Sequence, residues 1–287
     1  MSRIEIRNVS KNFNKTNALK NVCLALEPNK IYGLMGRNGA GKTTLLNIIS
    51  NKLFASSGEV LIDGETAVEN DNVQAKIFCM AEKNIYPVNM KVKDGIKWTK
   101  EFYPKFNTKY AYELANSFEL NTDKKIKDLS TGYNSVFTLI LGLASGASVI
   151  LFDEPVLGLD ANHRELFYRE LITNYIEQPK TIVISTHLID EIAEVLEEII
   201  IIKDGEIILS EPVDKVLLLG YKVSGDCTKV DKYTKHKNVI REETMGRFKA
   251  ATVYQNLDNV DKESIELLGL EIATVKLQEL IISLTNS

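Results

Sequence analysis

The sequence has 287 residues, of which 44% are hydrophobic and 26% are charged, an ordinary composition for a soluble globular protein. Its 35 basic and 39 acidic residues give a formal net charge of −4, which disfavours a general nucleic-acid binder because such proteins need a strongly basic face. Cys23, Cys79 and Cys227 are odd in number and form no C-x-x-C pair, so neither a disulfide framework nor a zinc site is expected. We expect reduced, cytosolic thiols and either one large domain or one domain with a small appendage.

Three segments near the N-terminus alternate apolar and polar residues as half-buried strands do, namely residues 4–9, 22–26 and 59–62. The third runs into Asp63-Gly64, a dipeptide typical of a two-residue hairpin turn. These features predict an antiparallel sheet. Phe13 lies in the loop between the first two strands, and its position alone indicates a core residue.

The phosphate-binding pattern G-x-x-x-x-G-K-[ST] follows an apolar run that begins at Ile31, and it reads Gly36-Arg37-Asn38-Gly39-Ala40-Gly41-Lys42-Thr43-Thr44. Apolar residues then recur at helical spacing, so the segment predicts a strand, a tight loop and a helix. In such a loop, backbone N–H groups and the positive end of the helix dipole hold a polyphosphate. Lys42 would reach the β and γ phosphates, and the Thr43 hydroxyl would coordinate Mg²⁺.

Residues 76–82 form an extended run, and residues 91–129 then change to helical periodicity. Pro104 ends the first helix of this part, and Asn107-Thr108 caps the second. We expect a helical insert within an α/β domain, at about residues 91–145. Its aromatic side chains indicate packing rather than a binding site.

A charge-free apolar run at residues 136–152 follows Leu129-Ser130-Thr131-Gly132-Tyr133, in which Ser130 is well placed as a helix N-cap. The run is short for a membrane span, and two glycines and a serine between residues 142 and 146 interrupt it. It predicts a buried helix followed by a buried strand. Any membrane role must therefore come through a partner.

The buried strand predicted at residues 148–154 ends in Asp153 and Glu154. In phosphate-loop enzymes the acid at this strand end binds Mg²⁺, and an adjacent one activates water. A structural alternative is a helix N-cap by Asp153 before a proline, but the phosphate loop upstream favours the catalytic interpretation. Asp160 then precedes a helix predicted at residues 161–177.

His187 ends another buried strand, predicted at residues 181–187. Open α/β sheets bind ligands at the carboxyl ends of their strands, which makes His187 a candidate site residue. His163 and His236 lack any such context. Residues 188–198 then predict an acidic amphipathic helix.

The C-terminal part begins after a hairpin predicted at residues 199–209 about Asp204-Gly205. Residues 221–250 hold eight basic and four acidic residues, which indicate a solvated surface more than contact with lipid head groups. A strand is predicted at residues 248–254 and a closing helix at residues 278–284. We expect a small α/β appendage that serves dimerisation or regulation.

Taken in order, these residues resemble the nucleotide-binding subunit of ATP-binding cassette (ABC) transporters, across approximately residues 1–220. The matching positions are Phe13 at the adenine-stacking aromatic, residues 36–44 as Walker A, Glu82 at the glutamine of the Q-loop, residues 129–133 as the signature, residues 150–154 as Walker B, Asp160 in the D-loop and His187 as the switch histidine. The signature departs from Leu-Ser-Gly-Gly-Gln but keeps Ser130 and Gly132. Glu82 is a larger departure, because a carboxylate still binds Mg²⁺ or water but repels phosphate.

The resemblance implies an α/β P-loop NTPase fold with a RecA-like core, an antiparallel β subdomain and an α-helical insert, plus a small C-terminal α/β appendage at residues 221–287. It implies the cofactors ATP and Mg²⁺, with Thr43, Glu82 and Asp153 on the metal. Lys42, Glu154 and His187 are the implied catalytic residues, because Glu154 would polarise the attacking water and His187 would bridge it to the γ-phosphate. The implied nucleotide-binding residues are Phe13, Gly36, Asn38, Gly39, Ala40, Gly41, Lys42, Thr43, Thr44, Ser130, Gly132 and Asp160.

By the same resemblance, two cassettes pack head to tail as a homodimer or a heterodimer, and each ATP lies between one Walker A and the other chain's signature. A separately encoded transmembrane permease subunit would be driven through the Glu82 loop and the helical insert, and nucleic acid is not an expected partner. The chain would lie at the cytoplasmic face of the cell membrane, held peripherally by that subunit. Its C-terminal extension resembles the tails of bacterial exporter cassettes, including those for amphipathic peptides such as phenol-soluble modulins. That implies export of a peptide, drug or lipid-like substrate.

Two other functions stay open from the sequence. One is a soluble ABC ATPase that acts on ribosomes or DNA; such proteins carry two cassettes or a long coiled-coil insertion, and neither feature occurs in this sequence. The other is an ATP-dependent assembly clamp with weak hydrolysis. Glu154 favours hydrolysis, whereas Glu82 and Tyr133 leave the clamp open.

Overall fold

The computed structural model describes residues 2–14, 16–80 and 86–286. Glu82, expected at the Q-loop position, lies outside the described residues. The chain divides into two compact units: unit 1 comprises Met1–His187 with Ile202–Ile208, and unit 2 comprises Leu188–Ile201 with Leu209–Ser287. We expected one domain at residues 1–220 and a second at residues 221–287. That boundary lies later in the chain than the boundary between the two compact units, and the expected domain limits stay a prediction.

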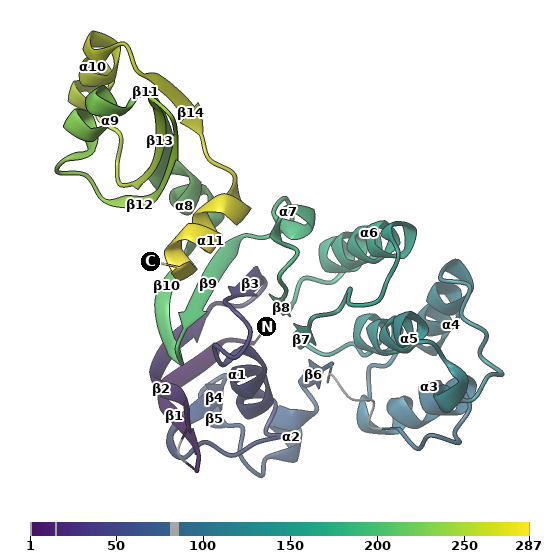
Figure 1. Cartoon of the computed structure of the whole chain (residues 1–287). Coiled ribbons are helices and arrows are strands. Elements are labelled where there is room, and N and C mark those ends of the chain that lie inside the picture. Colours follow the sequence, from purple (N-terminus) through teal and green to yellow (C-terminus); the bar gives the residue numbers. More distant parts are fainter. Residues whose placement is uncertain (1, 15, 81–85, 287) are drawn as a thin grey trace. The chain divides into compact units, whose positions relative to one another are not determined.

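Unit 1 contains an antiparallel sheet with the strand order β2-β1-β4-β5 (Figure 1). Ile4 lies opposite Leu26 on one side and opposite Ile62 on the other, and all three side chains are buried. The antiparallel sheet expected from the alternating pattern is therefore confirmed. Its strands are β1 (Ile4–Phe13), β2 (Thr16–Leu26), β4 (Ser57–Ile62) and β5 (Glu65–Thr66).

Phe13 is the last residue of β1 and not a loop residue. It pairs with Thr16 of β2, so the ladder continues to the end of the strand. The residue is 46% exposed, which shows that the core interpretation of Phe13 is wrong. Lys11 Nζ lies over its ring, 5.1 Å from the centroid.

A second sheet of unit 1 is formed by parallel strands in the order β3 (Ile31–Met35), β8 (Thr181–Ser185), β7 (Val149–Asp153) and β6 (Ile77–Cys79). Every residue of β3, β7 and β8 is buried, as is typical of parallel strands covered on both faces. On the other side of β3 the order continues to β9 (Glu198–Lys203) and β10 (Glu206–Pro212), whose turn residues belong to unit 1. Because the strands run parallel, the carboxyl ends of β3, β7 and β8 lie at one edge.

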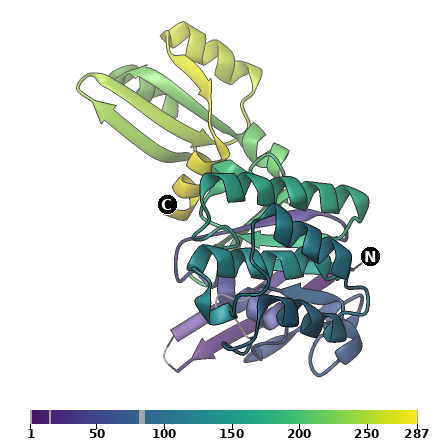
Figure 2. The same ribbon diagram turned by 90° about the vertical axis from the view of Figure 1, so that its right-hand side faces the viewer.

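The helices of unit 1 include a group formed by α3, α4 and α5, which lies beside β6 and faces the viewer in Figure 2. Asn107 Oδ1 accepts a hydrogen bond from Tyr110 N, and Ser130 Oγ accepts one from Tyr133 N, so both predicted caps are confirmed. The bounds are α1 (Lys42–Ile49), α2 (Asp71–Gln74), α3 (Val92–Phe102), α4 (Thr108–Ser117), the 3-10 turn η1 (Ile126–Asp128), α5 (Thr131–Ala144) and α6 (Ala161–Glu177).

The charge-free run at residues 136–152 forms the buried part of α5 and most of β7, as predicted. The end of α5 is marked by Ser145, whose hydroxyl donates to Gly142 O at 2.7 Å. Among the helices that the structure describes, none has the length and apolar character needed to cross a membrane.

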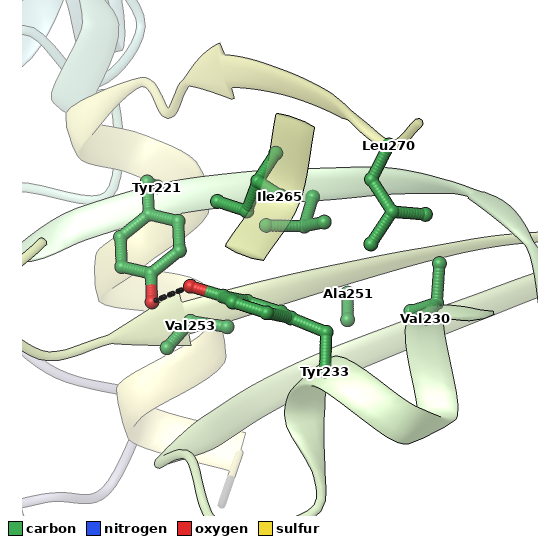
Figure 3. Packing of buried hydrophobic residues seen from close by; sticks show 8 residues of the cluster. Tyr221, Val230, Tyr233, Ala251, Val253, Ile265 and Leu270 are labelled. Atoms are coloured by element: carbon green, nitrogen blue, oxygen red, sulfur yellow. Dashed lines mark hydrogen bonds between the residues drawn. The ribbon is translucent and has the colours of Figure 1, made fainter. Parts of the chain in front are cut away.

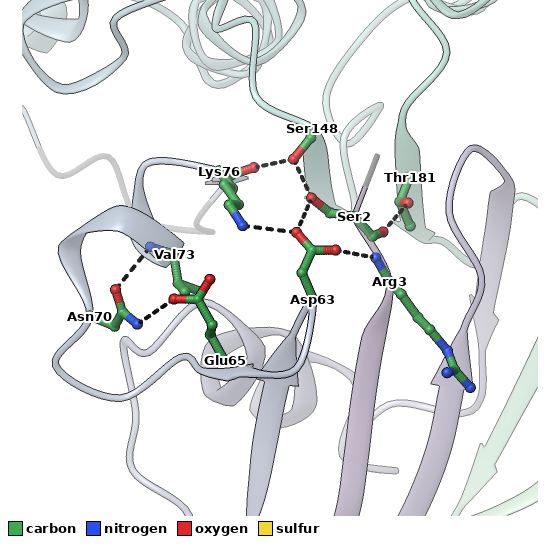
Figure 4. A network of polar contacts seen from close by, with 9 residues as sticks. All are labelled: Ser2, Arg3, Asp63, Glu65, Asn70, Val73, Lys76, Ser148 and Thr181. Carbon is green, nitrogen blue, oxygen red and sulfur yellow. Dashed lines mark hydrogen bonds and ion pairs between the residues drawn. The ribbon is translucent and has the colours of Figure 1, made fainter.

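A polar network holds the start of the chain against the amino ends of β7 and β8 (Figure 4). Asp63 Oδ2 accepts hydrogen bonds from Ser2 Oγ at 3.1 Å and from Lys76 Nζ at 2.8 Å. Thr181 Oγ1 donates to Ser2 O at 2.9 Å, and the hydroxyls of Ser2 and Ser148 lie 2.7 Å apart. The network satisfies polar groups that would otherwise be buried without partners.

Unit 2 has a sheet of its own with the order β12-β13-β11-β14, in which the described neighbours are antiparallel. Buried residues of the sheet pack against α9 and α10, and the hydroxyls of Tyr221 and Tyr233 lie 2.9 Å apart within this core (Figure 3). The predicted strand at residues 248–254 and the closing helix are confirmed. The elements are α7 (Ile189–Ile192), α8 (Val213–Leu219), β11 (Gly220–Asp226), α9 (Cys227–Thr234), β12 (Val239–Met245), β13 (Phe248–Tyr254), α10 (Asn259–Leu268), β14 (Glu271–Thr274) and α11 (Leu277–Asn286).

The helix expected at residues 188–198 is wrong beyond its first turn, because α7 ends at Ile192. Glu194, Glu197 and Glu198 would have occupied the last turns of a longer helix. There they would oppose the helix dipole and repel one another at i, i+3 and i, i+4 spacing. Glu198 instead begins β9.

Candidate functional site

The loop between β3 and α1 is shaped by glycines that no other residue could replace without movement. A Cβ at Gly36 would lie 2.3 Å from Ile202 O, and one at Gly41 would lie 2.7 Å from Ala18 O. Gly41 also has φ 112, a conformation that side chains rarely adopt. The predicted strand, tight loop and helix are confirmed, and the loop meets the N-terminus of α1, whose N-cap Gly41 has no side-chain cap among the described residues. The first N–H groups of a helix have no partner within the helix and can bind an anion.

Lys42, the first residue of α1, is only 6% exposed. Its Nζ donates hydrogen bonds to Gly36 O at 2.8 Å and to Arg37 O at 3.3 Å, so the ammonium is folded back over the loop. Both partners are neutral carbonyl oxygens. A phosphate bound in the loop would provide the opposite charge that these carbonyls lack.

Thr43, Asp153 and Ser185 meet at the carboxyl edge of the parallel sheet. Thr43 Oγ1 donates to Asp153 Oδ2 at 2.6 Å, and Ser185 Oγ donates to Asp153 Oδ1 at 2.8 Å. Asp153 is 8% exposed and is the last residue of β7, so the N-cap alternative for it is wrong. A hydroxyl and a carboxylate oxygen so close together fit Mg²⁺, which prefers oxygen ligands and takes few of them from protein.

Glu154 and His187 form the second pair of this edge. Both follow a strand and do not end it as predicted, because β7 ends at Asp153 and β8 at Ser185. His187 Nδ1 lies 2.8 Å from Glu154 Oε2, and the two side chains are 56% and 23% exposed, respectively. Glu154 has φ 48, which is uncommon for a residue other than glycine, and its N–H donates to Ser185 O at 2.9 Å. Such backbone strain is often found at functional sites. The carboxylate is accessible and oriented by an imidazole, which suits a general base.

Ser130, Gly132 and Asp160 lie at the starts of two helices, α5 and α6. A Cβ at Gly132 would lie 2.4 Å from Gly158 O, so the signature packs closely against the loop before α6. Asp160 Oδ1 accepts a hydrogen bond from His163 N at 2.9 Å, and this bond lowers the pKa of the carboxyl. In the described part of the chain, no hydrogen bond joins Ser130, Gly132 or Asp160 to the phosphate loop.

Four of the remaining candidates lie in the phosphate loop or in α1. Ala40 is 6% exposed, and its O accepts from Gly205 N at 3.0 Å. Asn38 and Gly39 are exposed, and Thr44 is half-buried in α1. The exposed ring of Phe13 leaves its assignment to adenine stacking as a prediction.

Ser185 and His163 are site neighbours that sequence reasoning missed. Ser185 follows from the pairing of β7 with β8, in which Asp153 lies opposite Ser185, and the polar run at residues 185–187 was the available signal. His163 was considered to lack context, but its Nδ1 lies 3.2 Å from Asp160 Oδ2. The i, i+3 spacing of Asp160 and His163 at the predicted helix start was the available signal for that contact.

Comparisons with known proteins agree with this geometry. The family model described as ABC transporter matches residues 19–157. The ABC transporter ATP-binding protein YtrB of Bacillus subtilis (strain 168) is 34% identical over 204 residues, which cover 71% of this chain and 70% of YtrB. The ribose import ATP-binding protein RbsA of Lactococcus lactis subsp. lactis (strain IL1403) is 29% identical, and the match covers 72% of this chain but only 44% of RbsA.

Solved structures agree as well. The dimeric structure of MJ0796, a bacterial ABC transporter cassette, matches with a TM-score of 0.66 and 28% identity over 73% of this chain and 98% of that cassette. A post-hydrolysis state of MJ0796 bound to ADP and Pi matches equally well. The expected P-loop NTPase cassette fold is therefore confirmed. This chain belongs to the ATP-binding cassette family of ABC transporters and is an ATPase of that family.

Proposed function

We propose that this chain hydrolyses Mg²⁺-bound ATP to power an exporter through a separately encoded membrane subunit. The observation that carries the proposal is the carboxyl edge of the parallel sheet, where the Thr43–Asp153 pair and the Glu154–His187 pair follow a phosphate loop. The first pair suits a metal, and the second suits a water that must lose a proton. An edge with both pairs supports hydrolysis more than an assembly clamp.

The roles follow from the contacts. Backbone N–H groups of the loop and the Lys42 ammonium would hold the β and γ phosphates, with Lys42 leaving its two carbonyl partners. Thr43 and Asp153 would hold Mg²⁺, which supplies positive charge next to the phosphates when bound. Glu154 would accept a proton from the attacking water, and His187 would keep the carboxylate oriented. Glu82 could add a metal ligand and lies outside the described residues.

A second cassette completes the site in this proposal. Ser130 and Gly132 make their contacts with their own α5 and the loop before α6, which leaves the α5 N-terminus available to a nucleotide held by another chain. The dimeric MJ0796 cassette supports a head-to-tail pair. We propose a homodimer or a heterodimer of cassettes, with Phe13 stacked on adenine and Asp160 near the partner.

An aromatic groove supports the proposal of a membrane subunit. A cavity of 740 Å³ in unit 1 is lined by residues from β6 and α3, including Trp98 and Phe102, which are 40% and 56% exposed. The Trp98 ring meets those of Tyr86 and Phe102 edge-on, at centroid distances of 5.4 Å and 5.1 Å. The exposure of these two rings departs from the packing role expected for the aromatics of the insert. Exposed aromatic clusters of this kind are typical of protein interfaces. The chain would thus be peripheral to the membrane, at its cytoplasmic face.

The C-terminal extension is the basis for proposing a transport direction and a substrate. We propose export of a peptide, drug or lipid-like substrate, as the resemblance of the C-terminal extension to exporter tails suggests. The relative RbsA is named for ribose import, so relatives of this chain serve import as well. Unit 2, with its separate core, is proposed to serve dimerisation or regulation.

The experiment uses the full chain, expressed in its host and recovered together with the host membranes. Glu154→Gln should stop turnover and trap an ATP-dependent dimer, measured by size-exclusion chromatography with and without ATP. A polytopic membrane protein should copurify at stoichiometric level with the wild type, and Trp98→Ala should weaken that association. Recovery with ribosomes, DNA or no partner would contradict the transporter proposal. ATP-dependent uptake of candidate peptides into inverted membrane vesicles would indicate export. ATP-dependent release of peptides from loaded vesicles would indicate import.

A further inference from the structure

His163 lies where three elements of unit 1 meet. Its ring is stacked on Phe118, which follows α4, at a centroid distance of 5.9 Å, and lies edge-on to Tyr133 of α5 at 5.8 Å. Its Nδ1 lies 3.2 Å from Asp160 Oδ2, at the start of α6. The His163 side chain is only 21% exposed, so the two aromatic rings restrict its orientation.

Asp160 is held at both carboxylate oxygens by this one residue. The backbone N–H of His163 donates to Oδ1, and the imidazole lies next to Oδ2. The Asp160 side chain is nevertheless 65% exposed. A polar contact to an exposed carboxylate contributes little to stability, because water competes for it, so the main effect of the double contact is to orient the carboxylate.

The signature residues are joined to the same loop by further contacts. Ser135 Oγ donates to Leu157 O at 3.0 Å, and the close approach of Gly132 to Gly158 leaves no space for a side chain. Tyr133 N donates to Ser130 Oγ, so the Tyr133 position is tied to the cap of α5. The start of α5 and the loop before α6 are therefore packed as one surface. His163 contacts Tyr133 and Asp160 of that surface.

We propose that His163 is a positioning residue for ATP hydrolysis, which fixes Asp160 and Tyr133 relative to each other so that a second cassette meets a preformed surface. This inference rests on the proposed function, because only a paired cassette would use that surface. Preformed geometry raises a rate by reducing the ordering needed in the reaction. Its loss should lower kcat and leave binding of ATP to the chain's own phosphate loop unchanged.

The test compares variants of the full chain. His163→Ala removes both the ring and the imidazole nitrogen, His163→Phe keeps a ring between Phe118 and Tyr133, and His163→Asn keeps a polar group near Asp160. Tyr110→Phe is the matched control, because Tyr110 Oη donates to Glu170 Oε2 at 3.3 Å and joins α4 to α6 away from Asp160. ATPase rates, titration with a fluorescent ATP analogue and thermal unfolding are measured for each.

We expect His163→Ala to lower kcat about tenfold with unchanged nucleotide affinity, and each of the other two His163 variants to recover part of the loss. Tyr110→Phe should keep the wild-type kcat. An active wild type whose His163 variants all have kcat within twofold of it would overturn the inference. So would an equal loss in Tyr110→Phe, since that indicates general loosening of the insert. A wild-type chain that hydrolyses no ATP would overturn the proposed function as well.

Discussion

Strands β7 and β8 have polar side chains at both ends, but the two ends use them differently. At the amino ends, Thr181 is 0% exposed and its hydroxyl donates to the backbone O of Ser2, a residue that is 2% exposed. At the carboxyl ends, the Glu154 and His187 side chains are 23% and 56% exposed, and Asp153 pairs with a residue of the phosphate loop helix. The amino ends thus fasten the chain, whereas the carboxyl ends keep the Glu154 carboxylate and the His187 imidazole accessible to a ligand.

The difference shows that a hydrogen-bonded polar residue is not by itself a site. What separates the two ends is the neighbouring glycine-rich loop, because Thr43 of α1 brings the N-terminus of that helix next to Asp153 at the carboxyl ends only. Substitutions at the carboxyl ends should therefore change activity more than stability. Substitutions at the amino ends should change stability more than activity.

Lys42→Ala should give the largest change in nucleotide binding. Loss of the ammonium removes a charge-assisted contact with phosphate, so we expect ATP affinity to fall roughly 100-fold or more. Isothermal titration calorimetry measures this directly. Lys52→Ala is a matched control, because Lys52 Nζ also donates to a backbone carbonyl, Cys79 O, at 2.8 Å. Equal loss in both variants would contradict the assignment of Lys42.

Asp153→Asn should raise the Mg²⁺ concentration needed for half-maximal ATPase rate, by about tenfold or more, because a neutral amide is a weaker ligand for a hard cation. The amide still accepts one hydrogen bond, so the unfolding transition should change little. Asp63→Asn makes the same chemical change at the opposite end of the strands. A Mg²⁺ requirement that shifts in Asp63→Asn, or fails to shift in Asp153→Asn, would remove the contrast.

Lys180, next to Thr181 at the amino end of β8, should make stability depend on pH. It is 4% exposed, its Nζ donates to Asn174 Oδ1 at 2.7 Å, and burial lowers its pKa from 10.5 to about 8. Below pH 8 the Lys180 ammonium is charged in both the folded and the unfolded chain. Between pH 8 and 10.5 Lys180 is protonated in the unfolded chain but largely neutral in the folded chain. The unfolded chain then binds more protons than the folded one, so the free energy of unfolding rises with pH in this range. The rise should be on the order of 2–3 kcal/mol.

Urea unfolding of the wild type and of Lys180→Met at several pH values tests this sign. The difference in unfolding free energy between the two should shift in favour of the wild type as pH rises through 8. A difference that is flat with pH would show that Lys180 is not buried as a charge. The ATPase rate per folded molecule should be the same in both.

Asp63→Ala should give the smallest of these effects, roughly 1–2 kcal/mol less stability, because Ser2 and Lys76 lose an acceptor in a partly exposed place. The ATPase rate should stay at the wild-type value. Denaturant unfolding with a parallel rate assay checks both. A rate loss without a stability loss would place Asp63 in the site after all.

Much of this site was predictable because its signals are local. The phosphate loop follows from one continuous pattern, and Asp153, Glu154 and His187 follow from polar residues at the ends of apolar strands. The same local reasoning located α6 and β13 at their observed bounds. These features depend on residues that are neighbours in sequence.

The rest depends on contacts between distant residues. Ser185 bonds with Asp153 across 32 positions, a contact set by strand order and not by either local sequence. The contact of His163 with Asp160 is local, but its ring contacts with Phe118 and Tyr133 join residues that are far apart in the sequence. Residues 188–198 are the opposite case, in which apolar periodicity predicts a helix although repulsion between the glutamates, also a local feature, disfavours one.

The most direct test of the central claim is the ATPase rate of Glu154→Gln beside its unfolding free energy. If the carboxyl edge is the hydrolytic site, the rate should fall roughly 100-fold or more while ATP binding and stability stay near wild type. The amide keeps the size of the side chain and loses the ability to accept a proton. A variant that hydrolyses ATP at the wild-type rate would contradict the assignment of Glu154 as the base and the contrast between the two ends of β7.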